Sequence, residues 1–207
     1  MRPAAFAVHP EPVTGDPSTM RWVIPAGSLD CGTVQQAPGL LGRWLAGGRI
    51  RRMVSEHAAL WITLDAAISW RAVGAEVRDA LIDALSVVPQ GAGPSADSGM
   101  PGGWRIAAAP EQVLELVSRD VLDGPVGEFV LAHGGVIRIV STADDVLTVN
   151  LDGACGHCAF AGVTLNERLK TAVRQRYPRI REVRTEDCAG SGPSWWGLRR
   201  SGRNSAS

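Results

Sequence analysis

Long apolar runs are missing from the sequence. No stretch of the 207 residues approaches the roughly 18 consecutive apolar residues of a membrane-spanning helix, and no apolar segment follows a basic start. We therefore expect neither a membrane span nor a secretory signal. The absence of both predicts a soluble protein of the cytoplasm.

Neither sign of charge is in excess. Lysine and arginine together number 21, as do aspartate and glutamate, and the pI is near 6.9. Lys170 is the only lysine, and the arginines are scattered among carboxylates instead of gathering with aromatic residues in a groove. This balance argues against nucleic acid or an acidic membrane as a partner. Arg49, Arg51 and Arg52 form a local exception, which indicates a solvated strand face or, as the alternative, a docking patch for an acidic partner.

Cysteine is scarce as well, which argues against a secreted disulfide framework. Of the four cysteines, Cys155 and Cys158 form a Cys-x-x-Cys pair, whereas Cys31 and Cys188 lie far away in sequence and have no such spacing. This usage favours a reducing compartment and a metal or redox role. We interpret Cys31 and Cys188 as non-ligands.

The Cys-x-x-Cys pair follows an alternating segment and precedes a helical one. Residues 146–151 alternate as in a half-buried strand, and apolar residues from Leu165 onward recur at three- and four-residue spacing. Gly153 and Gly156 permit a sharp loop between the two elements. A thiolate there gains from the positive end of the following helix dipole, which lowers its pKa and favours metal ligation or redox exchange.

One Cys-x-x-Cys supplies two of the four ligands that a tetrahedral sulfur site requires. Two copies of the chain meeting around a twofold axis would supply four. A thioredoxin-like dithiol and a structural zinc shared by a dimer are the alternatives. We rank the dithiol lower because such a motif follows a strand in a βαβ framework, whereas here a meander-like strand pair feeds the loop. His157, between the two cysteines, is interpreted as a loop side chain near a sulfur atom, with cluster ligation as the alternative.

The segment from Val121 to Glu186 resembles the C-terminal domain of NifU-like (Nfu-type) iron-sulfur cluster proteins. The resemblance rests on His133-Gly134-Gly135, on Leu151-Asp152-Gly153-Ala154-Cys155-Gly156-His157-Cys158, and on Thr164-Leu165 at the start of the helix. The chain departs from the family in having Ala159 where proline is usual and Val136 where aspartate is usual.

This resemblance implies a scaffold or carrier that is not an enzyme and has no catalytic residues. Its cofactor would be a [4Fe-4S] cluster held between two subunits by Cys155 and Cys158 of each, with [2Fe-2S] or zinc as alternatives for the same ligands. The implied partners are a second copy of the chain, apo iron-sulfur acceptor proteins and an upstream cluster-assembly machinery.

The fold class that we predict is α+β, with two small α+β domains joined by a flexible linker. Residues 1–88 form the first domain. Its motifs are Glu11-Pro12 followed by residues 17–22, then residues 48–53, and residues 61–64 with Trp70 at the start of a helix; on these motifs residues 11–87 resemble the domain that precedes the cluster domain in many Nfu-type proteins. The Gly/Pro/Ser-rich residues 89–110 form the linker, residues 111–188 the cluster-binding domain, and residues 189–207, with Trp195 and Trp196, a disordered tail. The first domain lacks any ligand spacing, which leaves contact with partners as its role.

The hydrophobic pattern also predicts individual elements, except in the proline-containing residues 1–17, which we expect to be an extended lead-in. Strands are expected at 18–24, 50–54, 59–64, 136–140, 146–151 and 180–184. Helices are expected at 40–45, 70–85, 113–122, 126–130 and 163–177.

Overall fold

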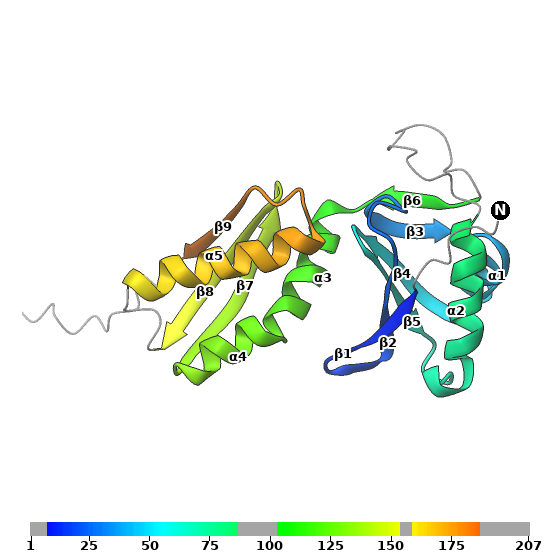
Figure 1. The fold of residues 1–207 in the computed structure, drawn as a ribbon, viewed down its shortest axis with the longest axis horizontal. Coiled ribbons are helices and arrows are strands. Elements are labelled where there is room, and N and C mark those ends of the chain that lie inside the picture. The colour runs from blue at the N-terminus through cyan, green and yellow to red at the C-terminus, as the bar shows by residue number, and fades with distance from the viewer. Residues whose placement is uncertain (1–7, 87–102, 154–158, 187–207) are drawn as a thin grey trace, which may run out of the picture.

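The computed structural model describes residues 8–86, 103–153 and 159–186, which form two units that each consist of a sheet covered by helices (Figure 1). Each unit has its own sheet, and the helices lie beside the sheets instead of alternating with the strands of one continuous sheet. The predicted α+β class is confirmed. None of the helices in the described ranges is both long and apolar enough for a membrane span.

The first unit contains a six-stranded antiparallel sheet with the order β1-β2-β5-β4-β3-β6. Two helices, α1 (Gly39–Ala46) and α2 (Trp70–Ser86), pack against one face of this sheet. The strands are β1 (His9–Val13), β2 (Asp16–Val23), β3 (Gly32–Gln36), β4 (Ile50–Glu56), β5 (Ala59–Leu64) and β6 (Arg105–Ala108).

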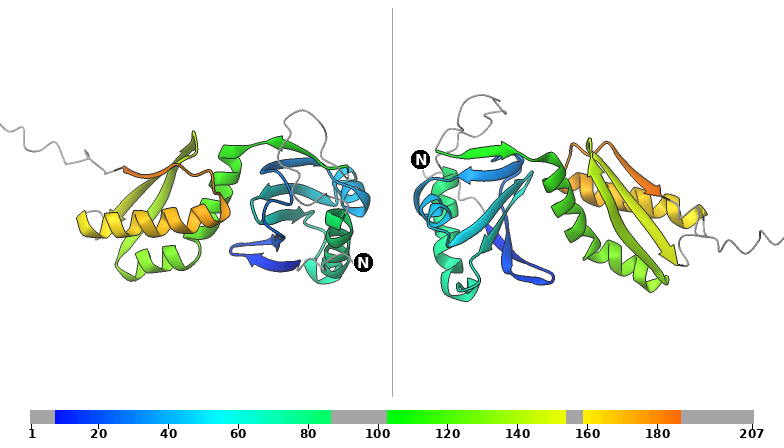
Figure 2. Two further views of the ribbon diagram at one scale, coloured as in Figure 1. Left: turned by 45° about the horizontal axis from the view of Figure 1, so that its top comes forward. Right: turned by 180° about the vertical axis from the view of Figure 1, so that it is seen from behind.

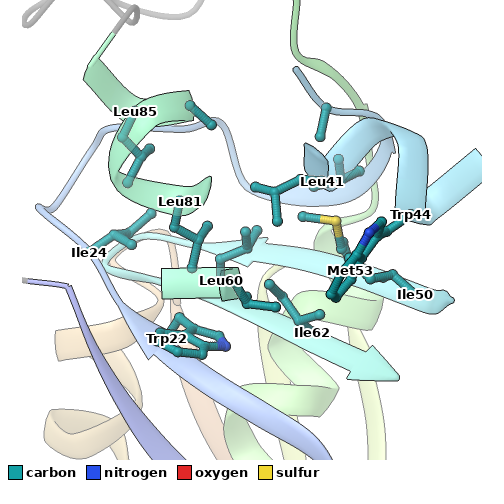
Figure 3. Close-up of a cluster of buried hydrophobic side chains, with 14 of the residues drawn as sticks. Trp22, Ile24, Leu41, Trp44, Ile50, Met53, Leu60, Ile62, Leu81 and Leu85 are labelled. Carbon is teal, nitrogen blue, oxygen red and sulfur yellow. The ribbon is translucent and has the colours of Figure 1, made fainter. Parts of the chain in front are cut away.

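The core of the first unit lies between the sheet and these two helices (Figure 3). Alternate residues of β2 and β5 point toward the helices, and β4, which is irregular between Ile50 and Arg52, contributes Met53; Trp22, Met53 and Leu60 are at most 1% exposed. Leu41 of α1 and Leu81 of α2 complete the layer, each with 0% exposure. The predicted strand pair 50–54 and 59–64 and the predicted helix 70–85 are therefore confirmed.

The second unit contains a three-stranded sheet with the order β7-β8-β9, in which β7 and β8 are antiparallel and β8 and β9 are parallel. Inward-facing residues of this sheet pack against three helices. The elements are α3 (Pro110–Leu122), α4 (Pro125–Ala132), β7 (Gly135–Ala143), β8 (Val146–Gly153), α5 (Ala159–Arg176) and β9 (Glu182–Glu186).

A tight junction connects the first two helices of the second unit. Pro125 begins α4 directly after Gly124, as the sequence predicts for a helix that restarts at a Gly-Pro pair. At Gly127 a Cβ atom would lie 1.7 Å from the carbonyl oxygen of Leu122, so only glycine allows this close approach of α4 to the end of α3.

Three strands of the first sheet were not expected from the sequence. Two of them, β1 and β6, form the edges, where β1 accommodates Pro10 and Pro12 because one side of an edge strand needs no hydrogen-bond partner. The third, β3, has five residues and pairs with β6. Short and proline-containing strands carry too little alternation to be recognised.

The last part of the segment expected to be a linker belongs to the first unit. Trp104 is 1% exposed in the first core, and its indole Nε1 donates a hydrogen bond to the carbonyl oxygen of Ala84 at 3.3 Å. β6 follows at once, and Pro110 begins α3. The structure thus differs from the expectation at residues 104–110, because one buried tryptophan fixes the chain after a Gly/Pro-rich stretch. Residues 87–102 and the expected tail lie outside the described residues.

The turn between β7 and β8 is held from the end of α5. Asp144 and Asp145 have φ of 54° and 59°, as in a two-residue hairpin turn. The Tyr177 hydroxyl donates to Asp145 Oδ1 at 2.5 Å, and the Arg181 amide donates to the Asp145 carbonyl at 2.8 Å. Burial raises the pKa of the Tyr177 hydroxyl, and the adjacent Asp145 carboxylate raises it further.

This raised pKa predicts a loss of stability at alkaline pH. Tyrosinate absorbance reports the ionisation of Tyr177 specifically, because the chain has one tyrosine. Above pH about 10 the unfolded state releases the phenol proton and the folded state does not. The free energy of unfolding should therefore fall by about 1.4 kcal/mol per pH unit. From neutral to alkaline pH, tyrosinate absorbance measures the ionisation of Tyr177, and denaturant titrations measure the free energy of unfolding.

The control is Tyr177→Phe, in which the alkaline slope should become flatter by the tyrosine contribution. Half-ionisation of Tyr177 at pH about 10 in the folded protein would contradict the prediction.

Candidate metal centre

The two candidate ligands, Cys155 and Cys158, lie outside the described residues, as do His157 and Cys188. The elements on both sides of the Cys-x-x-Cys are described. Strand β8 ends at Gly153, and helix α5 begins at Ala159. The strand before the motif and the helix after it, which the sequence predicted, are therefore confirmed.

An apolar cluster joins the two chain ends that lead into and out of the motif. Leu151, the last inward-facing residue of β8, packs with Leu165 of α5 and Val130 of α4, and these side chains are 6%, 2% and 1% exposed. Phe129 and Ile137 pack around them. Because neither end can move without opening this cluster, the cluster holds the end of β8 and the first turns of α5 against α4.

Backbone pairing fixes the same end of the sheet. The ladder between β7 and β8 continues to the pair Gly135 and Gly153, directly before the motif. One residue further in, Arg138 Nη1 of β7 lies 2.7 Å from Asp152 Oδ2 of β8. This exposed ion pair contributes little energy, so the ladder and the apolar cluster carry the local stability.

The turn that leads into β7 contains the predicted helix-end histidine. His133 caps the C-terminus of α4, and its Nδ1 lies 2.7 Å from the carbonyl oxygen of Phe129. The imidazole also packs on the Phe129 ring at 4.4 Å between centroids. A histidine suits the negative end of a helix dipole, and this placement confirms the interpretation of His133 as a helix-end residue.

Helix α5 presents its positive end to the motif. Its first turn contains no acidic residue, so no carboxylate of that turn offsets the partial charge of the free N–H groups. Such a position favours the thiolate over the thiol. The predicted electrostatic preference is therefore consistent with where this helix begins.

The strand arrangement corrects one argument made from the sequence. The motif does not only follow a meander, because β8 and β9 are parallel and α5 connects them. Cys155 and Cys158 thus lie, in sequence, at the strand-to-helix corner of a βαβ unit. The βαβ framework, whose expected absence argues against a dithiol oxidoreductase, is present in this domain.

The described residues form no second cluster of candidate metal ligands. Within residues 8–86, 103–153 and 159–186, no group of three or more His, Cys, Asp or Glu side chains is arranged to hold a metal ion. Cys31 precedes β3 in the first unit and packs against apolar residues, and burial raises the pKa of its thiol. A raised pKa disfavours the thiolate that a soft metal requires, and the interpretation of Cys31 as a non-ligand stays a prediction.

The arginine cluster of the first unit does not form one continuous patch. The Arg49 guanidinium lies over the Trp44 ring at 4.0 Å, and Arg51 Nε donates to Asp65 Oδ2 at 2.7 Å. Arg52 lines a small crevice beside Trp61. Two of the three arginines thus already have partners within the first unit, which reduces the docking surface proposed from the sequence.

The fold and the position of the motif define the class of the second unit. Residues 119–184, which run from the last turns of α3 into β9, match the model of the NifU-like domain. The matched stretch includes both cysteines of the motif. The C-terminal unit of this chain is a NifU-like domain.

A curated relative supports the same class. Over 65 residues the chain is 29% identical to a protein named Fe/S biogenesis protein NfuA from Serratia proteamaculans (strain 568). The match covers 31% of this chain and 34% of that protein, so the chain spans about a third of the length of this relative. The matched part of the chain is therefore similar to part of a protein with that name.

Two neighbouring residues of α4 provide a matched test of the cluster beside the motif. Val130 is 1% exposed, whereas Leu131 is 66% exposed. In apo-protein, Val130→Ala should lower the free energy of unfolding by about 1.5–3 kcal/mol, because it removes buried methyl groups and leaves a cavity. Leu131→Ala should change it by less than about 0.5 kcal/mol. Denaturant titration measures both, and equal effects of the two variants would show that the cluster does not support this end of the domain.

Proposed function

We propose that the chain is an iron-sulfur cluster carrier that holds a [4Fe-4S] cluster between two copies of itself and transfers it to apo-proteins. The carrying observation is the pair Cys155 and Cys158 between β8 and α5, within the stretch that matches the NifU-like domain. The name of the Serratia relative, which refers to Fe/S biogenesis, supports the same role.

The ligand count supports a site shared by two copies. Cysteine thiolates are the usual ligands of [4Fe-4S] clusters, which take four. Each copy supplies Cys155 and Cys158, and a twofold axis through the cluster gives the complete set. The exposed apolar residues Leu131 and Val136 flank the turn beside the last residues of β8, where a second copy would cover them.

A site at the end of a small domain is suited to a cluster that is bound temporarily and then passed to another protein. Transfer requires that thiolates of the acceptor reach the metal and displace those of the carrier, so a deeply buried site would hinder release. The same four thiolates also satisfy a [2Fe-2S] cluster, and zinc competes for them during purification. The proposed partners are therefore apo iron-sulfur acceptors in the cytoplasm and the machinery that loads the cluster.

The βαβ topology favours a second candidate, a thiol-disulfide oxidoreductase that uses the same cysteines. A dithiol at the N-terminus of a helix has a lowered pKa and exchanges with disulfides without any metal. We place this candidate second because the whole matched stretch, and not only the motif, is similar to the NifU-like domain.

Ligand identity is tested by single substitutions. Cys155→Ser and Cys158→Ser should each abolish nearly all bound iron and sulfide after anaerobic reconstitution, since serine is a poor ligand for a soft metal. Cys31→Ser and Cys188→Ser are the controls and should retain the wild-type content. The content of iron, sulfide and zinc per chain is measured for each variant and compared with wild type. Loss of the cluster in either control variant would contradict the shared site and would favour a site formed within one chain.

Dimer formation should depend on the cluster, because one chain carries half of the ligands and the cluster links the two copies. Sedimentation at matched concentrations should give a larger species for holo-protein than for apo-protein. A monomer that holds one full cluster would contradict the shared site. Disulfide reductase turnover by iron-free protein, together with no stable cluster, would favour the oxidoreductase.

A further inference from the structure

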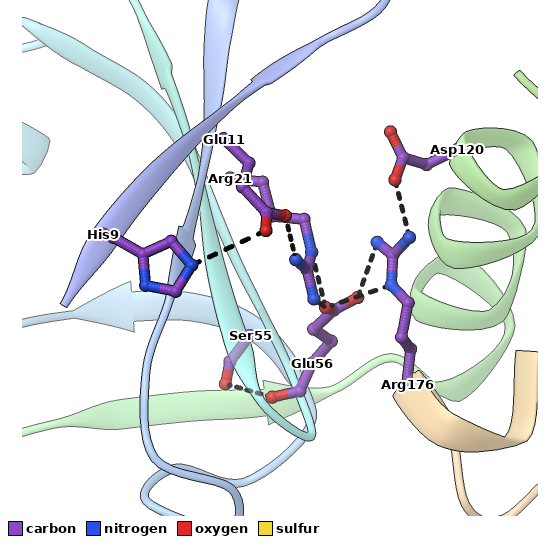
Figure 4. A network of polar contacts seen from close by, with 7 residues as sticks. All are labelled: His9, Glu11, Arg21, Ser55, Glu56, Asp120 and Arg176. Carbon is purple, nitrogen blue, oxygen red and sulfur yellow. Dashed lines mark hydrogen bonds and ion pairs between the residues drawn. The ribbon is translucent and has the colours of Figure 1, made fainter. Parts of the chain in front are cut away.

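A buried carboxylate connects the two units of the chain (Figure 4). Glu56, the last residue of β4, has 0% exposure. On one side, Arg21 of β2 donates to its Oε1 through Nε at 2.9 Å and through Nη2 at 2.5 Å. On the other side, Arg176 donates to its Oε2 through Nη2 at 3.2 Å. Arg21 belongs to the first unit and Arg176 to the second.

Arg176 is fixed by three groups at once. It is the last residue of α5, and its Nη1 donates to Asp120 Oδ2 of α3 at 2.6 Å. Its guanidinium also lies over the ring of Trp61 in β5, 5.4 Å from the centroid. Two of these contacts, with Glu56 and Trp61, cross from the second unit to the first.

An apolar cluster surrounds this charge network and crosses the same boundary. Val54 of β4 and Trp61 lie on the sheet face opposite α1 and α2, and both are at most 2% exposed. They belong to one cluster with Val113, Leu114 and Val117 of α3 and with the core of the second sheet. The first sheet is therefore covered on both faces, and the second unit provides the cover of one face.

The energetics of buried ions give this network a specific consequence. A carboxylate that is removed from water is tolerated only when cations and hydrogen bonds replace the lost hydration. Removal of one partner from a buried pair is therefore expensive, even where the intact pair adds little net stability. Any sliding or separation of the two units would remove Arg176 from Glu56 and leave the carboxylate with Arg21 as its main cationic partner.

We propose that Glu56 and Arg176 form a domain clasp, in which this buried ion pair locks the NifU-like domain onto the open face of the first sheet in one arrangement. The two units then unfold as one body and are not independent domains on a tether. Helix α5, which begins after the Cys-x-x-Cys, is held at its far end by the first unit. This proposal concerns the apo-chain and does not depend on the identity of the metal.

The clasp is tested with Arg176→Gln in the full chain, because this substitution leaves the Glu56–Arg21 pair in place. The matched control is Arg174→Gln on the same helix, whose guanidinium contacts the Ile180 carbonyl within the second unit at 3.3 Å. Hydrogen exchange at increasing denaturant compares amides of β4 and β5 with amides of β8 and α5. In wild type and control, the two groups should lose protection together.

In Arg176→Gln, amides of β8 and α5 should exchange about a hundredfold faster than in wild type, while those of β4 and β5 remain protected. Small-angle X-ray scattering should show a larger radius of gyration for this variant. Glu56→Gln, which keeps the shape of the side chain and removes its charge, should uncouple the two groups in the same way. Separate transitions in wild type, or an Arg176 variant indistinguishable from the Arg174 control in exchange and in size, would overturn the clasp.

Discussion

The structure depends on the requirement that α3 bury apolar side chains on two sides. One side of this helix faces the second sheet and α5, and another faces Val54 and Trp61 of the first sheet. A helix with a single apolar stripe would satisfy one of these neighbours. Because Val113, Leu114 and Val117 are all at most 1% exposed, α3 is a shared core element and not a connector between two finished domains (Figure 2).

The same requirement determines how the candidate metal centre is supported. The core of the second unit continues from α3 along β8, and within the described part of this strand it ends at Leu151. Packing therefore holds strand β8 in place up to the residues before the motif.

The sequence predicts those parts of the fold that have strong local signals. The alternation of β8, the helical spacing of α2 and the Gly-Pro restart at Gly124 each act within a few residues, and each is found in the structure. β6 was missed because its place depends on the burial of Trp104 against α2, a contact that composition does not reveal. Likewise, the pairing of Glu56 with Arg176 joins positions 120 residues apart, and neither has any special local pattern.

For the candidate site, the sequence identified the motif and the two elements around it. The predicted strand pair that leads into the motif is present, but the parallel pairing of β8 with β9 was not foreseen. A parallel pairing of β8 with β9 depends on where the chain returns after α5, which periodicity does not encode. Spacing and residue type thus predicted a thiolate site at the Cys-x-x-Cys. Which strands lie beside that motif was determined by tertiary contacts, which spacing does not reveal. The ligand assignment of Cys155 and Cys158 stays a prediction.

The hydrogen bond between Trp104 and the end of α2 changes the meaning of the Gly/Pro/Ser-rich segment. The chain leaves the first unit after Ser86 and returns to the same unit at Trp104, so residues 87–102 close a loop on one body whatever their path. The length of that segment consequently has no influence on the spacing of the two units. Doubling it would cost about 0.6 kcal/mol in loop-closure entropy, which makes it a position where peptide tags or reporter sequences can be inserted without altering the domain arrangement.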